Sequence, residues 1–291
     1  MITTSKASKI IPHIVLVIMT ILALMPIVLL FMASITDEQE LIKNGYSFFP
    51  KKLSLDAYKY IWNSGSVIMR AYATTVCITL VGTICHVAIV ALVAYPLSLR
   101  NLPGKRVFNF LILFTILFHG GLVPTYMIYT TVLHIKDTYL ALLVPNLLFS
   151  SFNAIIVRTY LRTNVPSELY ESAKIDGASE FRIFREIVLP LGKPIFVTIA
   201  VFAGLNYWND WTNGLYYISD SSKYSIQQLL NVMVKNIQYL TQYGRAPANG
   251  AIPSIGLRMA IAFIAMLPIL IMYPFLTKYF EKGITLGSVK G

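Results

Sequence analysis

Charged residues are scarce in this sequence. They make up 13% of its 291 residues, whereas 56% of the residues are hydrophobic. A soluble domain needs more polar residues than this to cover its surface, so the composition is typical of a membrane protein. The sequence also lacks low-complexity tracts, long linkers and a second polar domain, which favours a single compact membrane domain.

The usual sequence signals of a disulfide, a metal site or a nucleotide site are also missing. Cys77 and Cys85 are the only cysteines, and their separation corresponds to about 12 Å of helical rise, which is too long for a disulfide. The four histidines lack the spacing of metal ligands, and only His134 has an acidic residue, Asp137, within one helical turn. The phosphate-binding motif G-x4-G-K-[ST] is absent, so no cofactor is predicted for this chain. A membrane enzyme is therefore the weaker hypothesis.

Six charge-poor runs are long enough to cross a membrane as helices. About 20 apolar residues are needed to span the roughly 30 Å hydrocarbon core of a bilayer. The expected spans are residues 10–34, 71–99, 107–133, 138–158, 194–217 and 256–277. The sequence thus predicts an all-α integral membrane protein with an N-terminal segment (1–9), a transmembrane domain (10–277) and a C-terminal tail (278–291).

Lys and Arg are concentrated on the side of the membrane that holds both predicted termini. The segments on that side carry fourteen Lys or Arg and six acidic residues, whereas the opposite segments carry ten and seven. The positive-inside rule therefore places both termini in the cytoplasm. This topology also accounts for the net charge of +11, so nucleic acid is not an expected partner. The first run is much longer than the apolar part of a signal peptide, about 7 to 15 residues, and is expected to remain as the first span.

Two polar segments are expected on the outer side, residues 37–70 and 220–250. In the first, Ser54 can cap a short helix whose aromatic residues suit the membrane boundary. In the second, apolar residues recur at helical spacing and predict an amphipathic helix that is too polar to span. Either segment could pack against the rest of the chain or contact a partner outside the cell.

One inner segment, Glu168 to Pro190, carries eight charged residues. Ser167 is the predicted N-cap of a helix, Glu168 lies where the helix dipole favours an acidic residue, and Gly177 suits the left-handed position after a helix. This pattern predicts a helix of about ten residues that ends at Asp176.

A second short helix is predicted after this turn. Ser179 can cap it and Pro190 would end it. Phe181, Phe184 and Val188 would form its apolar stripe. The segment could be a solvated connection or a docking element, and the glycine turn and the charges of both signs favour docking against a matching surface.

The charged segment resembles a known motif. Its residues E-S-A-K-I-D-G-A-x5-F-x2-I-x-L-P, Glu171 to Pro190, are similar to the EAA loop of bacterial ATP-binding-cassette (ABC) importer permeases, whose usual form is E-A-A-x3-D-G-A with a downstream I-x-L-P. Ser172 stands in place of the usual Ala and is also small. N-Y-W-N-D-W from Asn206 resembles the W-N segment of the carbohydrate-importer permeases, and the ending from Tyr273 resembles the C-terminus of their maltose-type second subunit. The resemblance is greatest to the branch that imports complex or acidic oligosaccharides.

This resemblance implies a permease of the type I importer fold, located in the bacterial plasma membrane among its lipids. The expected partners are a second homologous permease subunit, two ATPase subunits, an extracytoplasmic solute-binding protein and a sugar substrate. ATP and Mg²⁺ would be bound by the ATPase subunits, and this chain would not be catalytic. The alternative is an ion-coupled secondary carrier, but such carriers need ionisable groups inside the membrane, and Asp210 is the only carboxylate in a predicted span.

The resemblance also assigns roles to individual residues. The helix that begins near Glu168 would be the coupling helix, which sits in a cleft of an ATPase subunit and moves with it. Glu171 and Asp176 would anchor it, and Gly177 would make the close turn. The residues expected at this contact are Glu168, Glu171, Ala173, Asp176, Gly177, Ala178 and Pro190. The tail would reach the ATPase subunits through Lys282, Gly287 and Lys290.

Polar and aromatic residues in the spans are the candidates for a sugar path, because hydroxyl groups need hydrogen bonds and sugar rings stack on aromatic rings. These candidates are Asn146, Ser150, Asn153, Asn206, Tyr207, Trp208 and Asn209. Interfacial tryptophans and hydrogen bonds between helices would account for the same residues. The sequence does not decide between the two interpretations.

Overall fold

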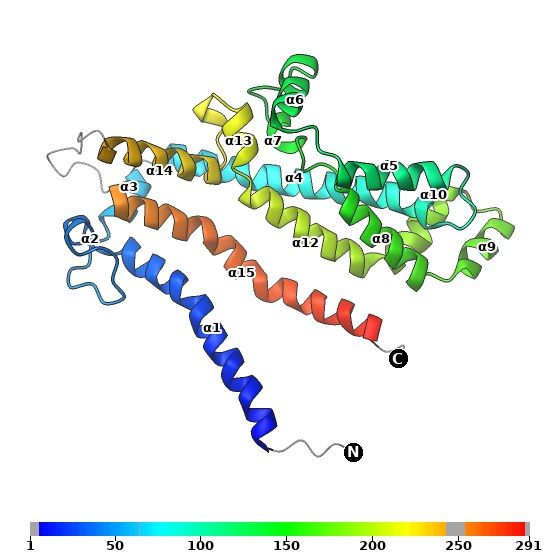
Figure 1. Cartoon of the computed structure of the whole chain (residues 1–291), viewed down its shortest axis with the longest axis horizontal. Coiled ribbons are helices and arrows are strands. Elements are labelled where there is room, and N and C mark those ends of the chain that lie inside the picture. The colour runs from blue at the N-terminus through cyan, green and yellow to red at the C-terminus, as the bar shows by residue number, and fades with distance from the viewer. Residues whose placement is uncertain (1–5, 64, 243–253, 289–291) are drawn as a thin grey trace. The chain divides into compact units, whose positions relative to one another are not determined.

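The structure, a computed structural model, describes residues 6–63, 65–242 and 254–288 (Figure 1). The regular structure of these residues is helical, apart from one isolated antiparallel bridge between Thr36 and Leu53. The expected all-α class is therefore confirmed. The chain divides into two compact units, Met1–Met69 with Leu229–Leu270 and Arg70–Gln228 with Ile271–Gly291.

Besides the first residues of α4 (Gly65–Ser98), the described part of the first unit contains all or part of α1 (Lys6–Ser34), α2 (Glu38–Asn44), α3 (Asp56–Asn63), α14 (Ile226–Gln242) and α15 (Ser254–Ser288). The rings of Phe31 in α1 and Phe263 in α15 pack with their centroids 5.0 Å apart. The Glu38 carboxylate accepts hydrogen bonds from the backbone N–H groups of Ile255 and Gly256, both at 2.9 Å. Glu38 therefore caps the first turn of α15 from another helix.

Both outer segments contain the short helices expected of them. The predicted helix after Ser54 is α3, and the Ser54 Oγ accepts a hydrogen bond from the N–H of Asp56 at 3.0 Å. The predicted amphipathic helix is α14, which buries Ile226 and Leu229. Residues 243–253, which complete the second outer segment, lie outside the described residues.

The second unit contains most of α4 (Gly65–Ser98) and the elements that follow it up to the start of α14. These elements are α5 (Lys105–Leu117), α6 (Leu122–Met127), a π-helix (Ile128–Val132), α7 (Leu140–Leu143), α8 (Ser151–Asn164), α9 (Ser167–Ile175), α10 (Glu180–Ile183), a π-helix (Phe184–Val188), α11 (Leu189–Leu191), α12 (Lys193–Asn209), α13 (Thr212–Tyr217) and a 3₁₀ turn (Ser221–Lys223). A core with Val90, Val157, Val188 and Ile199 at its centre joins the C-terminal half of α4 to α8, α9, α10 and α12. This core is the base on which the charged segment rests.

Two described helices are long and apolar enough to cross a membrane by themselves, Pro12–Ser34 and Ser66–Ser98. The helices from Lys105 to Val132 bend by 112°, and those from Glu180 to Asn209 bend by 79°. If each bent pair is one span, the described residues supply four candidate spans by length and composition. Ile255–Ile271 of α15 is a shorter apolar helix.

Three of the expected spans are interrupted in the structure. The run 107–133 breaks after Leu117, the run 138–158 is divided between α7 and α8, and the run 194–217 breaks at Asp210. Each run was expected as one helix, and the structure corrects that expectation. The hydrophobic pattern continues across all three breaks, so hydropathy alone could not reveal them.

Local chemistry explains where these helices stop. Gly121 has a φ of +84°, and Asn146, one of the residue types that tolerate the left-handed region, has a φ of +60°. The Asp210 carboxylate accepts hydrogen bonds from the N–H groups of Thr212 (3.1 Å) and Asn213 (3.3 Å). It thereby satisfies the first turn of α13, so the chain can restart a helix there.

Candidate functional site

The first helix of the charged segment ends as predicted. α9 stops directly before Asp176, and the following Gly177 has a left-handed φ of +78°. The N–H of Gly177 donates to the carbonyl oxygen of Lys174 (3.0 Å), and the N–H of Ala178 donates to that of Ala173 (2.9 Å). These two bonds form a Schellman motif, which fixes the end of the helix and the direction of the chain after it.

The start of α9 differs by one residue from the prediction. Pro166 is the N-cap, and Ser167, expected as the cap, is the first helical residue. Pro166 makes no side-chain cap hydrogen bond. The acidic Glu168 in the first turn still complements the positive end of the helix dipole.

The two faces of α9 have different surroundings. Tyr170 is 9% exposed and Ala173 packs beside it against the core. Glu168, Glu171 and Ile175 follow at i, i+3 and i+7 on the opposite face, where all three are exposed and Ile175 reaches 86%. Within the described ranges, neither Glu168 nor Glu171 forms an ion pair. The inner face of α9 is therefore packed against the core, and its outer face presents unpaired negative charge to solvent.

The second helix of the segment begins as predicted and ends differently. The Ser179 Oγ accepts a hydrogen bond from the N–H of Arg182 at 3.3 Å, which confirms the predicted cap. The helix continues through a π-helical turn, in which the N–H of Leu189 donates to the carbonyl oxygen of Phe184, and ends near Gly192. Pro190 was expected to end the helix but lies inside it. Proline has no backbone N–H to donate, and the wider π-turn directly before Pro190 accommodates its ring.

The π-turn also changes which side chains are buried. The predicted apolar stripe was Phe181, Phe184 and Val188. Val188 is fully buried and Phe184 is half-buried, but Phe181 is 70% exposed, and Ile183 takes its place in the core. A π-turn contains one residue more than a normal turn, so a stripe extrapolated with period 3.6 loses its phase there.

A buried tyrosine of α4 ties the two short helices to the membrane domain. The Tyr95 hydroxyl donates to Glu180 Oε2 at 2.7 Å, and the Lys174 ammonium donates to Glu180 Oε1 at 2.6 Å. The Tyr95 ring also packs against the rings of Tyr170 (centroids 6.1 Å apart) and Phe184 (5.7 Å). α9, α10 and α4 are thus linked through one carboxylate.

The electrostatics of this link favour the ionised form of Glu180. The hydrogen bond from Lys174, followed by that from Tyr95, holds the pKa of the Glu180 carboxyl below its ordinary value. Arg182 likewise donates to Glu186 Oε2 at 3.0 Å and lowers the pKa of that carboxyl. Arg182 and Glu186 are both exposed.

The residues expected to line a sugar path fall into two groups. Tyr207 and Asn153 are buried, and Ser150 caps α8 by accepting a hydrogen bond from the Asn153 N–H at 3.3 Å. Trp208 is also buried, with its ring edge-on to that of Tyr72 at 6.4 Å. The exposed group consists of Asn146, Asn206 and Asn209.

Tyr207 of the buried group, together with Asn213 and His86, satisfies backbone oxygens in the broken span between α7 and α8. Non-helical backbone at membrane depth needs hydrogen-bond partners, because lipid supplies none. The three bonds join Tyr207 Oη to Leu143 O (2.9 Å), Asn213 Nδ2 to Pro145 O (2.9 Å) and His86 Nδ1 to Leu147 O (2.6 Å). A carbonyl oxygen only accepts, so His86 Nδ1 carries the proton and Nε2 accepts from the Asn153 amide at 2.9 Å. His86 is therefore a packed core histidine.

The remaining candidate residues lie near the C-terminus. α15 continues as a helix to Ser288, so its backbone includes Lys282 and Gly287. Lys290 lies outside the described residues. Among the residues searched, 6–63, 65–242 and 254–288, no group of three His, Cys, Asp or Glu side chains is placed to hold a metal ion.

Comparison with known proteins gives matches over nearly the whole chain. The family model for binding-protein-dependent transport system inner membrane components matches residues 1–286. Protein LplC of Bacillus subtilis (strain 168) is 38% identical over 270 residues, which are 93% of this chain and 90% of that protein. The polygalacturonan/rhamnogalacturonan transport system permease protein YtcP of the same organism is 35% identical over 277 residues, 95% of this chain and 96% of that protein. A crystal structure of a bacterial ABC transporter involved in the import of the acidic polysaccharide alginate contains a chain that superposes with a TM-score of 0.82 at 25% identity, covering 95% of this chain and 98% of that one.

Proposed function

We propose that this chain, which belongs to the family of binding-protein-dependent transport system inner membrane components, is one permease subunit of an ATP-driven importer of oligosaccharides. Support for the substrate class comes from two similar proteins, whose names refer to polygalacturonan/rhamnogalacturonan transport and to alginate import. The chain would form half of the translocation path beside a second, homologous permease subunit. An extracytoplasmic binding protein would deliver the sugar.

The coupling role rests on the geometry of α9. Its inner face is fixed through Tyr170 and Ala173 to the core, its end is fixed by the Schellman motif, and its outer face carries Glu168, Glu171 and Ile175. An element that transmits a displacement must be rigid, since a flexible loop would absorb the movement. α9 would sit in a cleft of an ATPase subunit, with ATP and Mg²⁺ bound by the ATPase subunits.

The proposed topology has six spans with both termini in the cytoplasm. The two long helices, the bent pair from Lys105 to Val132, the α7–α8 segment, α12 with α13 and the apolar part of α15 would supply these spans. The boundaries at residues 10 and 277 and the contact of the tail through Lys282, Gly287 and Lys290 are part of the same proposal. The charge distribution is what supports the orientation.

For the sugar path we propose the exposed asparagines, Asn146, Asn206 and Asn209. Their amides are not used in the bonds that satisfy the broken span, whereas the Tyr207 hydroxyl and the Asn153 amide are committed to neighbouring groups. Asn209 Nδ2 donates to the carbonyl oxygen of Leu205 at 2.9 Å, so its amide oxygen is the group offered to the path. Amide groups in such a path would bind sugar hydroxyls by donating and accepting hydrogen bonds.

The proposed coupling face can be tested with a matched pair of variants in the assembled transporter. Ile175 and Phe49 are similarly exposed, 86% and 88%, but Phe49 lies in the first outer segment. Ile175→Asp should reduce co-purification of the ATPase subunits about tenfold, as loss of a central apolar contact does in interfaces, and Phe49→Asp should leave it unchanged. If the ATPase subunits co-purified equally with the wild type, Ile175→Asp and Phe49→Asp, the assignment of α9 as the coupling face would be overturned.

The energy source needs a separate measurement. Proteoliposomes that contain the assembled transporter should take up sugar only with internal ATP and the external binding protein. Uptake that an uncoupler abolishes and that persists without the ATPase subunits would instead identify an ion-coupled carrier.

A further inference from the structure

Three basic residues lie near the place where α5 and α8 pack together. Lys105 is the first residue of α5, and the positive charges of Arg162 and Arg158 on α8 act on its ammonium group. The Lys105 ammonium donates to the carbonyl oxygen of Leu99, and Arg158 Nη1 donates to Asn109 Oδ1 at 2.5 Å. Two of the three cations are thus oriented by neutral acceptors.

Among the residues whose side chains the structure describes, no carboxylate compensates these charges. None of the three basic residues forms an ion pair with a side chain in that part of the chain. Between residues 99 and 166 the sequence contains a single acidic residue, Asp137, whose carboxylate accepts hydrogen bonds from the N–H groups of Ser219 and Asp220. Like charges that are held together repel each other, so their arrangement favours a bound anion.

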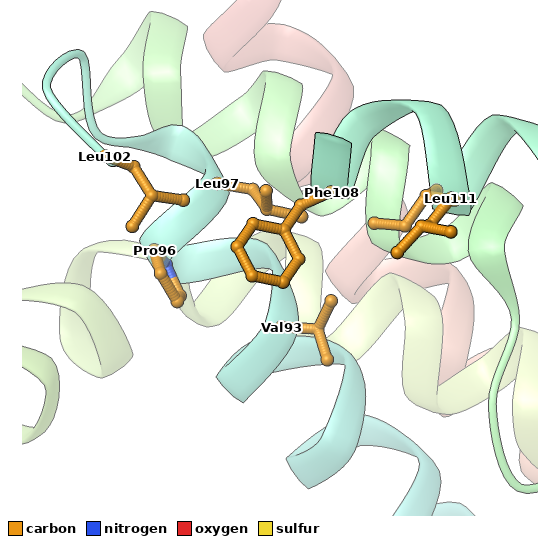
Figure 2. A pocket seen from close by; sticks show the side chains of 7 residues that line it. Val93, Pro96, Leu97, Leu102, Phe108 and Leu111 are labelled. Atoms are coloured by element: carbon orange, nitrogen blue, oxygen red, sulfur yellow. The ribbon is translucent and has the colours of Figure 1, made fainter. Parts of the chain in front are cut away.

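An apolar cavity of about 320 Å³ lies beside this cluster (Figure 2). Its walls come from the end of α4, the turn after it and the first turns of α5, as Figure 2 shows with Val93, Pro96, Leu97, Leu102, Phe108 and Leu111. Phe108 follows Lys105 by one helical turn. Because these walls offer no hydrogen-bonding side chain, the cavity suits a hydrocarbon segment rather than a polar ligand.

We propose that this part of the chain binds an anionic phospholipid, with its phosphate on Lys105, Arg158 and Arg162 and one acyl chain in the apolar cavity. Guanidinium and ammonium groups form strong charge-assisted hydrogen bonds with phosphate oxygens. Basic pockets between helices at the cytoplasmic boundary are the expected place for anionic head groups. A free phosphate would use the cations alone, and the adjoining apolar cavity is what favours a lipid. The proposal requires a membrane position for this chain but not its coupling to an ATPase.

The test measures lipid retention by the assembled transporter. The complex is stripped of lipid in detergent, loaded with phosphatidylglycerol, phosphatidylcholine or inorganic phosphate, and analysed by native mass spectrometry. The wild type should retain phosphatidylglycerol and release phosphatidylcholine. The triple variant Lys105→Gln, Arg158→Gln, Arg162→Gln should bind phosphatidylglycerol about a hundredfold more weakly.

Further variants separate head-group binding from chain binding and from misfolding. Arg162→Gln alone removes an exposed cation with no ion pair in the described chain and should weaken retention about fivefold even if the triple variant does not assemble. Arg182→Gln, which removes a cation already paired with Glu186, is the matched control and should not change retention. Leu102→Trp should fill part of the cavity and weaken binding of the lipid.

Three results would overturn the proposal. The first is equal retention of phosphatidylglycerol by the wild type and by Arg162→Gln. The second is displacement of the lipid by an equal concentration of inorganic phosphate, which would indicate a simple anion site. The third is loss of the ATPase subunits from Arg162→Gln with lipid retention unchanged, which would assign the cluster to a protein contact.

Discussion

Gly177 sets the direction of the chain between α9 and α10. Its φ of +78° is left-handed, and a Cβ added there would meet no atom within 4 Å. The cost of any other residue therefore comes from its own backbone and not from packing against this chain. That cost is about 1 to 2 kcal/mol for an ordinary residue and smaller for Asn, which tolerates this conformation.

A series of substitutions at Gly177 should follow backbone preference. Gly177→Asn should retain most of the sugar uptake driven by ATP, Gly177→Ala should lose part of it, and Gly177→Val should uncouple uptake from ATP hydrolysis while the chain still inserts in the membrane. The measurement is the ratio of sugar transported to ATP hydrolysed in proteoliposomes. If Gly177→Asn and Gly177→Val lowered the ratio equally, the defect would come from a clash between the new side chain and a partner subunit. The left-handed backbone would then not be the cause.

Asp137 fixes the turn between the π-helix Ile128–Val132 and α7. It has a φ of +57°, and hydrogen bonds from the backbone N–H groups of Asp220 and Ser219 lower the pKa of its carboxyl. A carboxyl with a lowered pKa stabilises the folded state when it is ionised. This stabilisation is complete above the ordinary Asp value, about 3.9, and is lost as the pH falls through the lower folded value.

Asp137→Asn tests this charge with little change in shape, because Asn also tolerates a left-handed backbone. The variant should melt at a lower temperature than the wild type at pH 7. The difference should shrink as the pH falls from about 4 toward the lower folded value, at which the wild-type carboxyl also becomes neutral. Thermal unfolding of the purified complex at several pH values provides the measurement. A difference for Asp137→Asn that is independent of pH would contradict the assignment.

Local sequence signals located some residues of the candidate site. Residues whose partners are far away in the sequence could not be predicted. The left-handed Gly177 and the cap Ser179 could be predicted, because each depends on a few neighbouring residues. Glu180 was not singled out, because its partner Tyr95 is 85 residues away. Tyr207 was expected on the sugar path, but the polarity of a side chain does not tell whether it binds a ligand or a backbone oxygen.

At the scale of elements, α9 and α10 share one hydrophobic core with the end of α4. Their shared core and the Tyr95 hydrogen bond connect the proposed coupling helix to a helix long enough to cross the membrane. The exposed ion pair between Lys174 and Glu180 contributes little by itself, about 0 to 1 kcal/mol, since solvent screens it. The bond from the buried Tyr95 hydroxyl to a carboxylate is the stronger connection, about 1.5 to 3 kcal/mol.

Two tyrosines that touch each other allow this connection to be tested. Tyr95→Phe removes the hydroxyl that binds Glu180 and keeps the ring that packs against Tyr170. The Tyr170 hydroxyl is buried without a hydrogen-bond partner, so Tyr170→Phe should be neutral or stabilising. We expect Tyr95→Phe to lower the sugar transported per ATP hydrolysed while the complex remains assembled, and Tyr170→Phe to leave that ratio unchanged. Equal ratios for the two variants would show that the hydroxyl does not contribute to coupling.

The interrupted helices explain why the elements were harder to predict than the fold class. Composition and apolar run length indicated an all-α membrane protein and located the two long helices. The break between α7 and α8 is stabilised by Tyr207, Asn213 and His86, which come from three other parts of the second unit. A hydropathy profile averages over the break and does not contain these contacts.

At the scale of the whole molecule, the proposed orientation and the proposed coupling face depend on each other. α9 can reach an ATPase subunit only if the segment between α8 and α12 faces the cytoplasm, and the first outer segment must then face the other side. Lys and Arg are more frequent in the segments that lie on the same side of the membrane as the two termini, and this bias predicts the orientation. One measurement of sidedness therefore tests both proposals.

Single cysteines can report this sidedness in intact cells. A background without Cys77 and Cys85 removes both native thiols, since these are the only cysteines of the chain. In that background Lys51→Cys, exposed in the first outer segment, should react with a membrane-impermeant maleimide, whereas Glu171→Cys, exposed on α9, should react only after the membrane is permeabilised. Labelling of Glu171→Cys from outside would place α9 away from any cytoplasmic ATPase and would remove the basis for its coupling role, whatever the uptake of the Gly177 and Tyr95 variants.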